Sequence, residues 1–173
     1  GGTATIPGVG TLTIGVNGSY TFTPALNYNG PVPGVTYTVS DGFLAATSSL
    51  AIAIASVNDA PVGNPDAKVT NEDTSASGNV LSNDTDVDGD TLSVTQFVWN
   101  GVTTAAGSTA TITGVGTLTI GVDGSYTFTP ALNYHGAVPS ATYTLSDGSL
   151  STTSTLALVM TSVNDAPRSE ERR

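Results

Sequence analysis

The chain repeats itself at a fixed distance, and this repeat constrains the possible folds more than any other feature. Thr3–Ile6 returns as Thr109–Ile112, and Gly18–Pro24 returns as Gly124–Pro130. Both pairs are 106 residues apart, and 45 of the 61 positions that can be aligned at this offset are identical. Similarity of this extent indicates tandem copies of one structural unit.

The offset divides the chain into three parts. Residues 1–61 are the C-terminal part of one repeat, residues 62–167 are one complete repeat, and residues 168–173 are a tail or the start of a further repeat. A period of about 106 residues exceeds the roughly 20 to 50 residues of solenoid units, but it suits a β-sandwich of about 100 residues. We therefore expect separate sandwich domains joined by linkers.

Apolar and polar residues alternate along many short segments, as in Thr11–Ile14 and Tyr20–Thr23. Alternation with a period of two is typical of strands, and no long helical pattern competes with it. The sequence predicts an all-β chain folded as an Ig-like β-sandwich. In the complete repeat, strands are expected near residues 67–70, 79–81, 91–99, 109–112, 116–121, 125–129, 141–145 and 154–162.

Turn residues separate these strands. Asn17-Gly18 and Asp123-Gly124 lie between alternating segments, which predicts two-residue hairpin turns. Trp99 precedes Asn100-Gly101, so we expect this side chain to be partly buried beside a further hairpin.

The first 61 residues lack a counterpart of residues 62–106 and so supply only the later strands of a sandwich. Because the two copies are so alike, residues 62–106 could complete either one. We expect them to complete the second copy and to leave half of the first core exposed. Unpaired strand edges invite pairing with another chain, so self-association by strand exchange is expected as a hazard.

The charge balance excludes several function classes. The chain has 14 acidic and 4 basic side chains, and its net charge is −10. Such a surface repels nucleic acid and anionic lipid, so neither nucleic-acid binding nor membrane insertion by this segment is expected. There is no cysteine, which excludes disulfides and thiol chemistry.

Half of the acidic residues lie between residues 66 and 90, and the loop at residues 83–90 is the densest part. Its oxygen ligands recur at every second position and a glycine follows, which suits calcium (Ca2+). A helix-loop-helix calcium site is excluded, because its twelfth position would be Thr95 instead of glutamate. The simplest alternative is a solvated acidic loop that aids solubility. The loop's candidate ligands are Asp84, Asp86, Asp88 and Asp90.

Three motifs together resemble the bacterial cadherin-like tandem repeats of large RTX-type adhesins and biofilm proteins: the linker Val57–Pro61, the segment Asn71–Thr74 and the acidic loop. The resemblance implies that calcium sits at domain junctions. Its ligands would be an early glutamate, an Asp-x-Asp segment and an Asn-Asp linker. The matching positions are Glu72, Asp84, Asp86, Asp88, Asn58 and Asp59. Ser56 departs from the pattern, since cadherin linkers carry an aspartate there.

No residue makes a convincing catalytic group. His135 is the only histidine and its counterpart is Asn29, which could not replace a general base. Asp41 and Asp147 lie in Ser-Asp-Gly turns without a second acidic neighbour, so they do not form a glycosidase pair. We therefore expect no enzyme.

The expected function is a calcium-rigidified extender module of a bacterial cell-surface adhesin. Such a module would be extracellular and would project a binding domain for cell adhesion or biofilm formation. Its partners would be neighbouring repeats of the same protein. Two alternatives stay open: a module that binds surface glycan or a sister chain, with Tyr28 and Tyr134 as stacking residues, and a filament subunit assembled by strand exchange.

Overall fold

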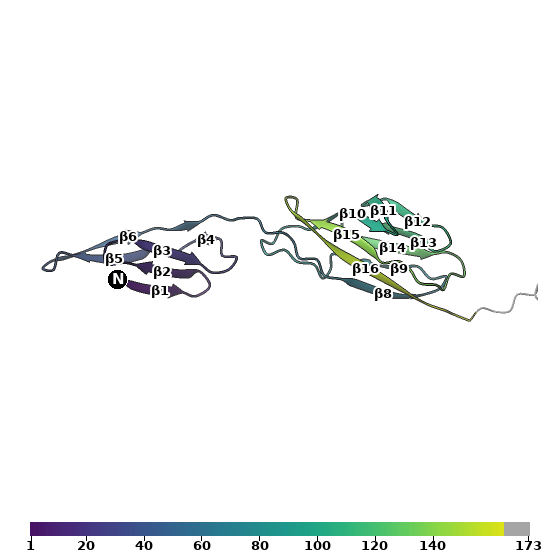
Figure 1. Ribbon diagram of the computed structural model, residues 1–173, viewed down its shortest axis with the longest axis horizontal. Helices are drawn as coiled ribbons and strands as arrows, with labels where there is room; N and C mark the ends of the chain where they lie inside the picture. The colour runs from purple at the N-terminus through teal and green to yellow at the C-terminus, as the bar shows by residue number, and fades with distance from the viewer. Residues whose placement is uncertain (165–173) are drawn as a thin grey trace, which may run out of the picture. The chain divides into compact units, whose positions relative to one another are not determined.

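The computed structural model describes residues 1–164 and builds them from strands β1 to β16 without a helix (Figure 1). The predicted all-β class is confirmed. The chain divides into two compact units, Gly1–Val57 and a second unit that begins at Asn58. The predicted tail at residues 168–173 lies outside the described residues.

The second unit is a sandwich of two sheets. One sheet has the strand order β11-β10-β15-β16-β8, and the other has the order β12-β13-β14-β9. All pairs are antiparallel except that between β16 and β8. The strands are β8 (Asp66–Asn71), β9 (Ala76–Asn79), β10 (Ser93–Trp99), β11 (Val102–Ala105), β12 (Thr109–Ile112), β13 (Gly116–Ile120), β14 (Ser125–Pro130), β15 (Ala141–Ser146) and β16 (Ser151–Thr161).

The core of the second unit lies between the two sheets, because alternate side chains of each strand point inward. Along β13, Leu118 and Ile120 are fully buried while Thr119 between them is partly exposed. Trp99 meets Phe128 of the opposite sheet edge to face, with ring centroids 5.9 Å apart. Trp99 is more buried than predicted, and its indole N–H donates to the carbonyl of Pro139 (2.7 Å). Burial of each such side chain contributes about 1.5–3 kcal/mol.

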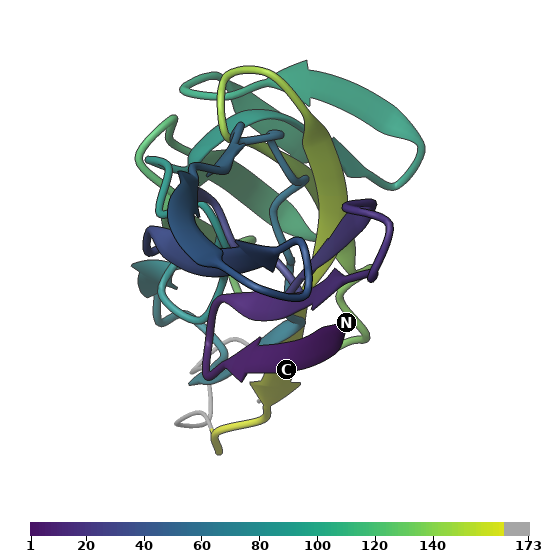
Figure 2. The same ribbon diagram turned by 90° about the vertical axis from the view of Figure 1, so that its left-hand side faces the viewer.

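The first unit repeats only the later strands of this sandwich. β1 (Gly2–Ile6), β2 (Gly10–Ile14) and β3 (Tyr20–Pro24) form one sheet (Figures 1 and 2). Two ribbons complete the unit: β4 (Gly30–Pro31) pairs with β7 (Ala53–Ile54), and β5 (Val35–Ser40) pairs with β6 (Ala45–Leu50). Among its hydrophobic residues, only Leu12 and Val32 are buried. The first unit therefore has the strands of a sandwich without its full core.

Two strand predictions need correction. The strand predicted at residues 79–81 ends at Asn79, because the Asn79 side chain accepts a hydrogen bond from the Leu81 N–H and turns the chain (2.8 Å). β11 was missing from the expected strands, although the hairpin at Asn100-Gly101 was predicted and is confirmed. It follows Asn100-Gly101, where both residues have positive φ (49° and 77°), as a two-residue hairpin turn requires.

The predicted two-residue turn at Asp123-Gly124 is wrong. Four residues, Gly121–Gly124, separate β13 from β14, and only the glycine of the Asp-Gly pair has positive φ (78°). The Asp123 carboxylate instead accepts hydrogen bonds from the N–H and the hydroxyl of Ser125 (3.0 and 2.6 Å). These contacts form an Asx turn that fixes the third loop residue against the first residue of β14.

Candidate metal centre

The acidic loop folds around the side chain of Asp86. One carboxylate oxygen of Asp86 accepts hydrogen bonds from the N–H groups of Asp88 (2.8 Å) and Asp90 (3.4 Å). Gly89 has φ of 81°, a value that residues with a side chain rarely adopt. A backbone bridge between Val62 and Thr85 (2.8 and 3.1 Å) holds the start of the loop. These contacts turn alternate side chains of the loop to one side.

Three carboxylates gather there. Asp86, Asp88 and Asp90 each offer one oxygen, and these oxygens lie within 4.8 Å of one another. The second oxygen of Asp86, Oδ2, is buried and has no hydrogen-bond partner in the described part of the chain. A buried carboxylate oxygen without a partner is costly, whereas hard oxygen ligands at this spacing suit calcium. The donor set therefore fits this cation.

The linker that opens the second unit contacts the same loop. The N–H of Asp59 donates to a carboxylate oxygen of Asp88 (2.8 Å). The Asn58 side-chain amide donates to Asp147 Oδ2 (2.8 Å) and to the carbonyl of Asp59 (3.1 Å). The structure thus joins the predicted linker residues to the acidic loop and adds Asp147.

Asp147 was not predicted to belong to the site. It lies in the turn between β15 and β16, and the hydrogen bond from Asn58 and those from the N–H groups of Leu150 and Ser149 hold its pKa below the usual 3.8. Its only sequence signal was the Ser-Asp-Gly turn, which both repeats share. The contact with Asn58 joins residues that are 89 positions apart in the chain, so no local sequence pattern predicts it.

Asp84, by contrast, has both carboxylate oxygens engaged elsewhere. Oδ1 accepts a hydrogen bond from the N–H of Asn64 (2.6 Å), and Oδ2 accepts one from the Tyr143 hydroxyl (3.0 Å). Asp84 does line the same open cleft as Asp86 and Asp90. Its contacts nevertheless direct it toward the β15 strand and give it a structural role.

The Tyr143 hydroxyl is surrounded by acceptors. Asp66 Oδ2, Asp84 Oδ2 and the carbonyl of Val80 each lie 3.0 Å from it, and the carbonyl of Asn64 lies at 3.3 Å. Burial raises the pKa of Asp66 above 3.8, and the nearby Asp84 charge adds to the shift, although the hydrogen bond from Tyr143 opposes it. The single hydroxyl proton of Tyr143 is thus shared among four acceptor oxygens.

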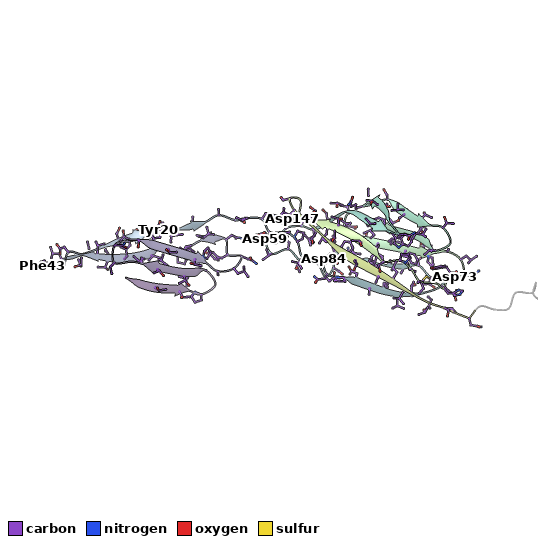
Figure 3. All side chains as sticks on the ribbon, in the orientation of Figure 1. Tyr20, Phe43, Asp59, Asp73, Asp84 and Asp147 are labelled. Carbon is purple, nitrogen blue, oxygen red and sulfur yellow. The ribbon has the colours of Figure 1, made fainter. Side chains whose placement is uncertain are left out.

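Glu72 lies at the other end of the second unit, in the connection between β8 and β9. Figure 3 shows its neighbour Asp73 there, far from the labelled Asp84, Asp59 and Asp147. Glu72 is buried, and its Oε1 accepts a hydrogen bond from the N–H of Val163 (2.5 Å). The structure therefore does not bring Glu72 together with the acidic loop of the same repeat.

The surroundings of Glu72 form a second polar site. His135 Nδ1 lies 3.7 Å from Glu72 Oε2, and Asp73 accepts a hydrogen bond from the N–H of Asn133 (2.7 Å). Glu72, Asn133, His135 and Asn164 line one open cleft. Each end of the unit thus carries carboxylate and amide side chains: those around Asn58-Asp59 at one end, and those beside the segment that reaches Asn164 at the other.

These observations define an all-β protein of the cadherin-like sandwich class, with acidic loops at its domain ends. Residues 58–162 match the model of the bacterial cadherin-like domain, and residues 3–55 match that of a cadherin-like domain. The chain belongs to the bacterial cadherin-like domain family. Domains of this kind are extracellular, generally bind calcium and typically have adhesive rather than enzymatic roles.

One solved structure shows the same fold at low identity. The EC1-2 fragment of human protocadherin-24 is similar with a TM-score of 0.50 and 19% identity over 96% of this chain and 81% of that one. An endo-fucoidan hydrolase of glycoside hydrolase family 107 aligns with a TM-score of 0.40 and 17% identity, and the match covers 94% of this chain. The chain spans only 24% of that hydrolase. Comparison with curated proteins gives no match.

Among the described residues, no helix is long and apolar enough to span a membrane.

Proposed function

We propose that this chain is an extender module of a bacterial cell-surface adhesin, such as the RTX-type adhesins, and that calcium stiffens it. The module holds a binding domain away from the cell for adhesion or biofilm formation, and it has no catalytic role. One observation carries the proposal. The acidic loop combines a buried Asp86 oxygen, which has no hydrogen-bond partner among residues 1–164, with a direct contact between Asp88 and the linker residue Asp59.

The contact with the linker makes the cation mechanically relevant. A linker without such contacts lets neighbouring domains reorient, whereas a cation that binds loop and linker together restricts that motion. Asn58 and Asp59 also belong to the segment that joins successive repeats. Calcium at this position would therefore change the stiffness of a string of repeats.

The proposed ligands fall into two groups. One group lies at the start of the repeat and comprises Asn58, Asp59, Asp86, Asp88, Asp90 and Asp147, whereas Asp84 supports the loop through Tyr143. Glu72 belongs to the other end, where we propose that it serves the following junction. The repeat boundaries proposed from the sequence, at residues 61 and 167, place one junction at each end.

Calorimetric titration of the full chain with calcium tests the proposal. We expect binding to raise the stability of the second unit by about 2.7 kcal/mol when free calcium exceeds Kd a hundredfold. The double variant Asp86→Asn/Asp88→Asn should lose this binding, because it removes two carboxylate charges from the cluster. Small-angle scattering should give a longer maximum dimension with calcium than with chelator.

A matched pair of variants controls for general charge effects. Asp147 and Asp41 occupy equivalent turns and accept equivalent backbone hydrogen bonds, but only Asp147 contacts Asn58. Asp147→Asn should weaken calcium binding several-fold while Asp41→Asn leaves it unchanged. Equal effects of the two variants, or unchanged calcium binding after loss of both Asp86 and Asp88 charges, would exclude the proposed site.

The glycan-binding alternative gains no support from the tyrosines on which it depended. The hydroxyls of Tyr28 and Tyr134 donate to the carbonyls of Pro31 and Ala137, both at 2.6 Å. Both rings are also half-buried. Such contacts fix a chain corner, which is a packing role in both repeats.

A further inference from the structure

We propose that Lys68 keeps the free edge of β8 closed to the same strand of a second copy of this chain, so that copies lying side by side do not join their sheets. β8 is the last strand of the five-stranded sheet and pairs only with β16 among the described strands (Figure 1). Its other edge therefore presents backbone N–H and C=O groups that a further strand could use. This edge belongs to the second unit, whose two sheets enclose a full core.

The outer face of this edge is apolar. Val69 of β8 is 62% exposed, and Val159, its partner on β16, is 51% exposed. Ala67 shares the outer face of β8 and is exposed as well. An exposed apolar edge strand of six residues is a template for pairing with another chain. A second copy is the occupant that fits, because a two-fold axis pairs an edge with itself and brings two identical apolar faces together.

Lys68 lies on the inward face of this strand. Side chains alternate along a strand, and the residues two positions before and after Lys68 point inward. Asp66 accepts a hydrogen bond from the buried Tyr143 hydroxyl (3.0 Å), and Thr70 is 8% exposed. Lys68 shares their face but is itself exposed. Its ammonium group therefore reaches water at the open side of the sandwich, along the free edge of β8.

A further strand on this edge would cover that route to water. Lys68 is the only lysine or arginine in residues 1–164, and no carboxylate in this range forms an ion pair with it. Pairing would therefore bury an ammonium group without a compensating charge, which is costly. Each pair of copies would bury two such groups, and their like charges repel. An inward-pointing charge on an edge strand is one of the ways in which β-sheet proteins prevent such pairing.

Sedimentation velocity of the full chain at several concentrations tests the proposal. Chelator is present, so that calcium cannot bridge acidic chains and the outcome does not depend on the calcium proposal. Lys68→Val should lower the dissociation constant for self-association on the order of tenfold or more, because it removes the charge that pairing would bury. Amide exchange measured by mass spectrometry should slow in residues 66–71 as this variant associates, and it should stay constant in the wild-type chain. Exchange in this segment separates pairing at β8 from association through any other part of the chain.

Lys68→Arg and Lys68→Glu are the matched controls, since each keeps a charge at the same position. Both should sediment as the wild-type chain does. Lys68→Thr is the second neutral variant, with the same expected association should Lys68→Val fold poorly, and circular dichroism checks the folding of each variant. Wild-type sedimentation and exchange in both neutral variants, or association of Lys68→Glu equal to that of Lys68→Val, would overturn the proposal.

Discussion

Single residues show how the same side chain gains different roles in the two copies. Tyr143 and Tyr37 are equivalent in sequence, yet Tyr143 is fully buried with four oxygens around its hydroxyl, and Tyr37 is half-buried. All four of those oxygens come from residues that precede β10. Because the first unit has no counterpart of this segment, the equivalent tyrosine has no equivalent environment.

Tyr143→Phe should therefore lower the free energy of unfolding of the second unit by about 1–3 kcal/mol, since it leaves buried acceptors without their donor. The matched variant Tyr37→Phe should change stability by less than about 0.5 kcal/mol. Urea denaturation followed by circular dichroism measures both. Equal effects would mean that the network around Tyr143 adds nothing to stability.

Asp66 should make stability depend on pH in an unusual direction. Its folded-state pKa is raised, first by burial, so the folded state binds the proton more tightly than the unfolded state does. The ionised Asp66 carboxylate therefore lowers the free energy of unfolding at neutral pH. This penalty shrinks as pH falls through the raised pKa toward 3.8, because the folded state takes up the proton first. Asp147 has a lowered pKa and acts in the opposite sense, since its contribution is lost at low pH.

The difference between the wild-type chain and Asp66→Asn isolates this effect. We expect the variant to melt at the same or a higher temperature at pH 7, and we expect its advantage to shrink as pH falls toward 4. Melting curves in chelator at several pH values measure this. A variant that is less stable than wild type at pH 7 by a constant amount at every pH would contradict the assigned cause.

At the scale of secondary-structure elements, two strands with the same sequence are buried to different extents in the two units. Residues Tyr126–Pro130 of β14 and Tyr20–Pro24 of β3 have the same sequence. Among the described strands, however, only β14 pairs on both of its edges. Phe128 on β14 is fully buried against Trp99, whereas Phe22 on β3 is partly exposed. Strand identity thus does not determine strand burial.

Phe128→Ala should cost about 3–5 kcal/mol of unfolding free energy in the second unit, because it opens a cavity in a closed core. Phe22→Ala should cost clearly less, because water already reaches the ring. Chemical denaturation of the full chain, with Trp99 fluorescence as the probe of the second unit, gives the first value, and circular dichroism gives the second. A Phe22→Ala cost equal to that of Phe128→Ala would show that the first core is closed.

At the scale of the whole molecule, the two units should differ in resistance to proteolysis. The first unit buries only Leu12 and Val32 among its hydrophobic residues, and Phe43 at a hairpin tip is 96% exposed. Segments with few buried contacts unfold locally more readily, and proteases cleave the locally unfolded segments. Limited digestion with chymotrypsin should therefore cut within residues 1–57 first and leave a fragment that begins near Asn58. Cleavage of the second unit first would contradict this order.

The family and the fold could be predicted from the sequence because their signals are local and repeated. Alternation along β13 and β14 predicted strands, and the 106-residue offset predicted tandem sandwiches. The two-residue turn predicted at Asp123-Gly124 was wrong. The dipeptide permits a short turn, but the contact of Asp123 with Ser125 selects a longer one.

The sequence by itself determined the all-β class, the repeat and the acidic character of residues 83–90, since each depends on neighbouring residues or on a simple offset. Only the tertiary structure decided what each carboxylate does. It turned Asp84 toward Tyr143, joined Asp147 to Asn58 and placed Glu72 beside Val163. Between 59 and 91 residues separate these partners, and such pairs form only where packed sheets bring distant loops to the same end of a sandwich.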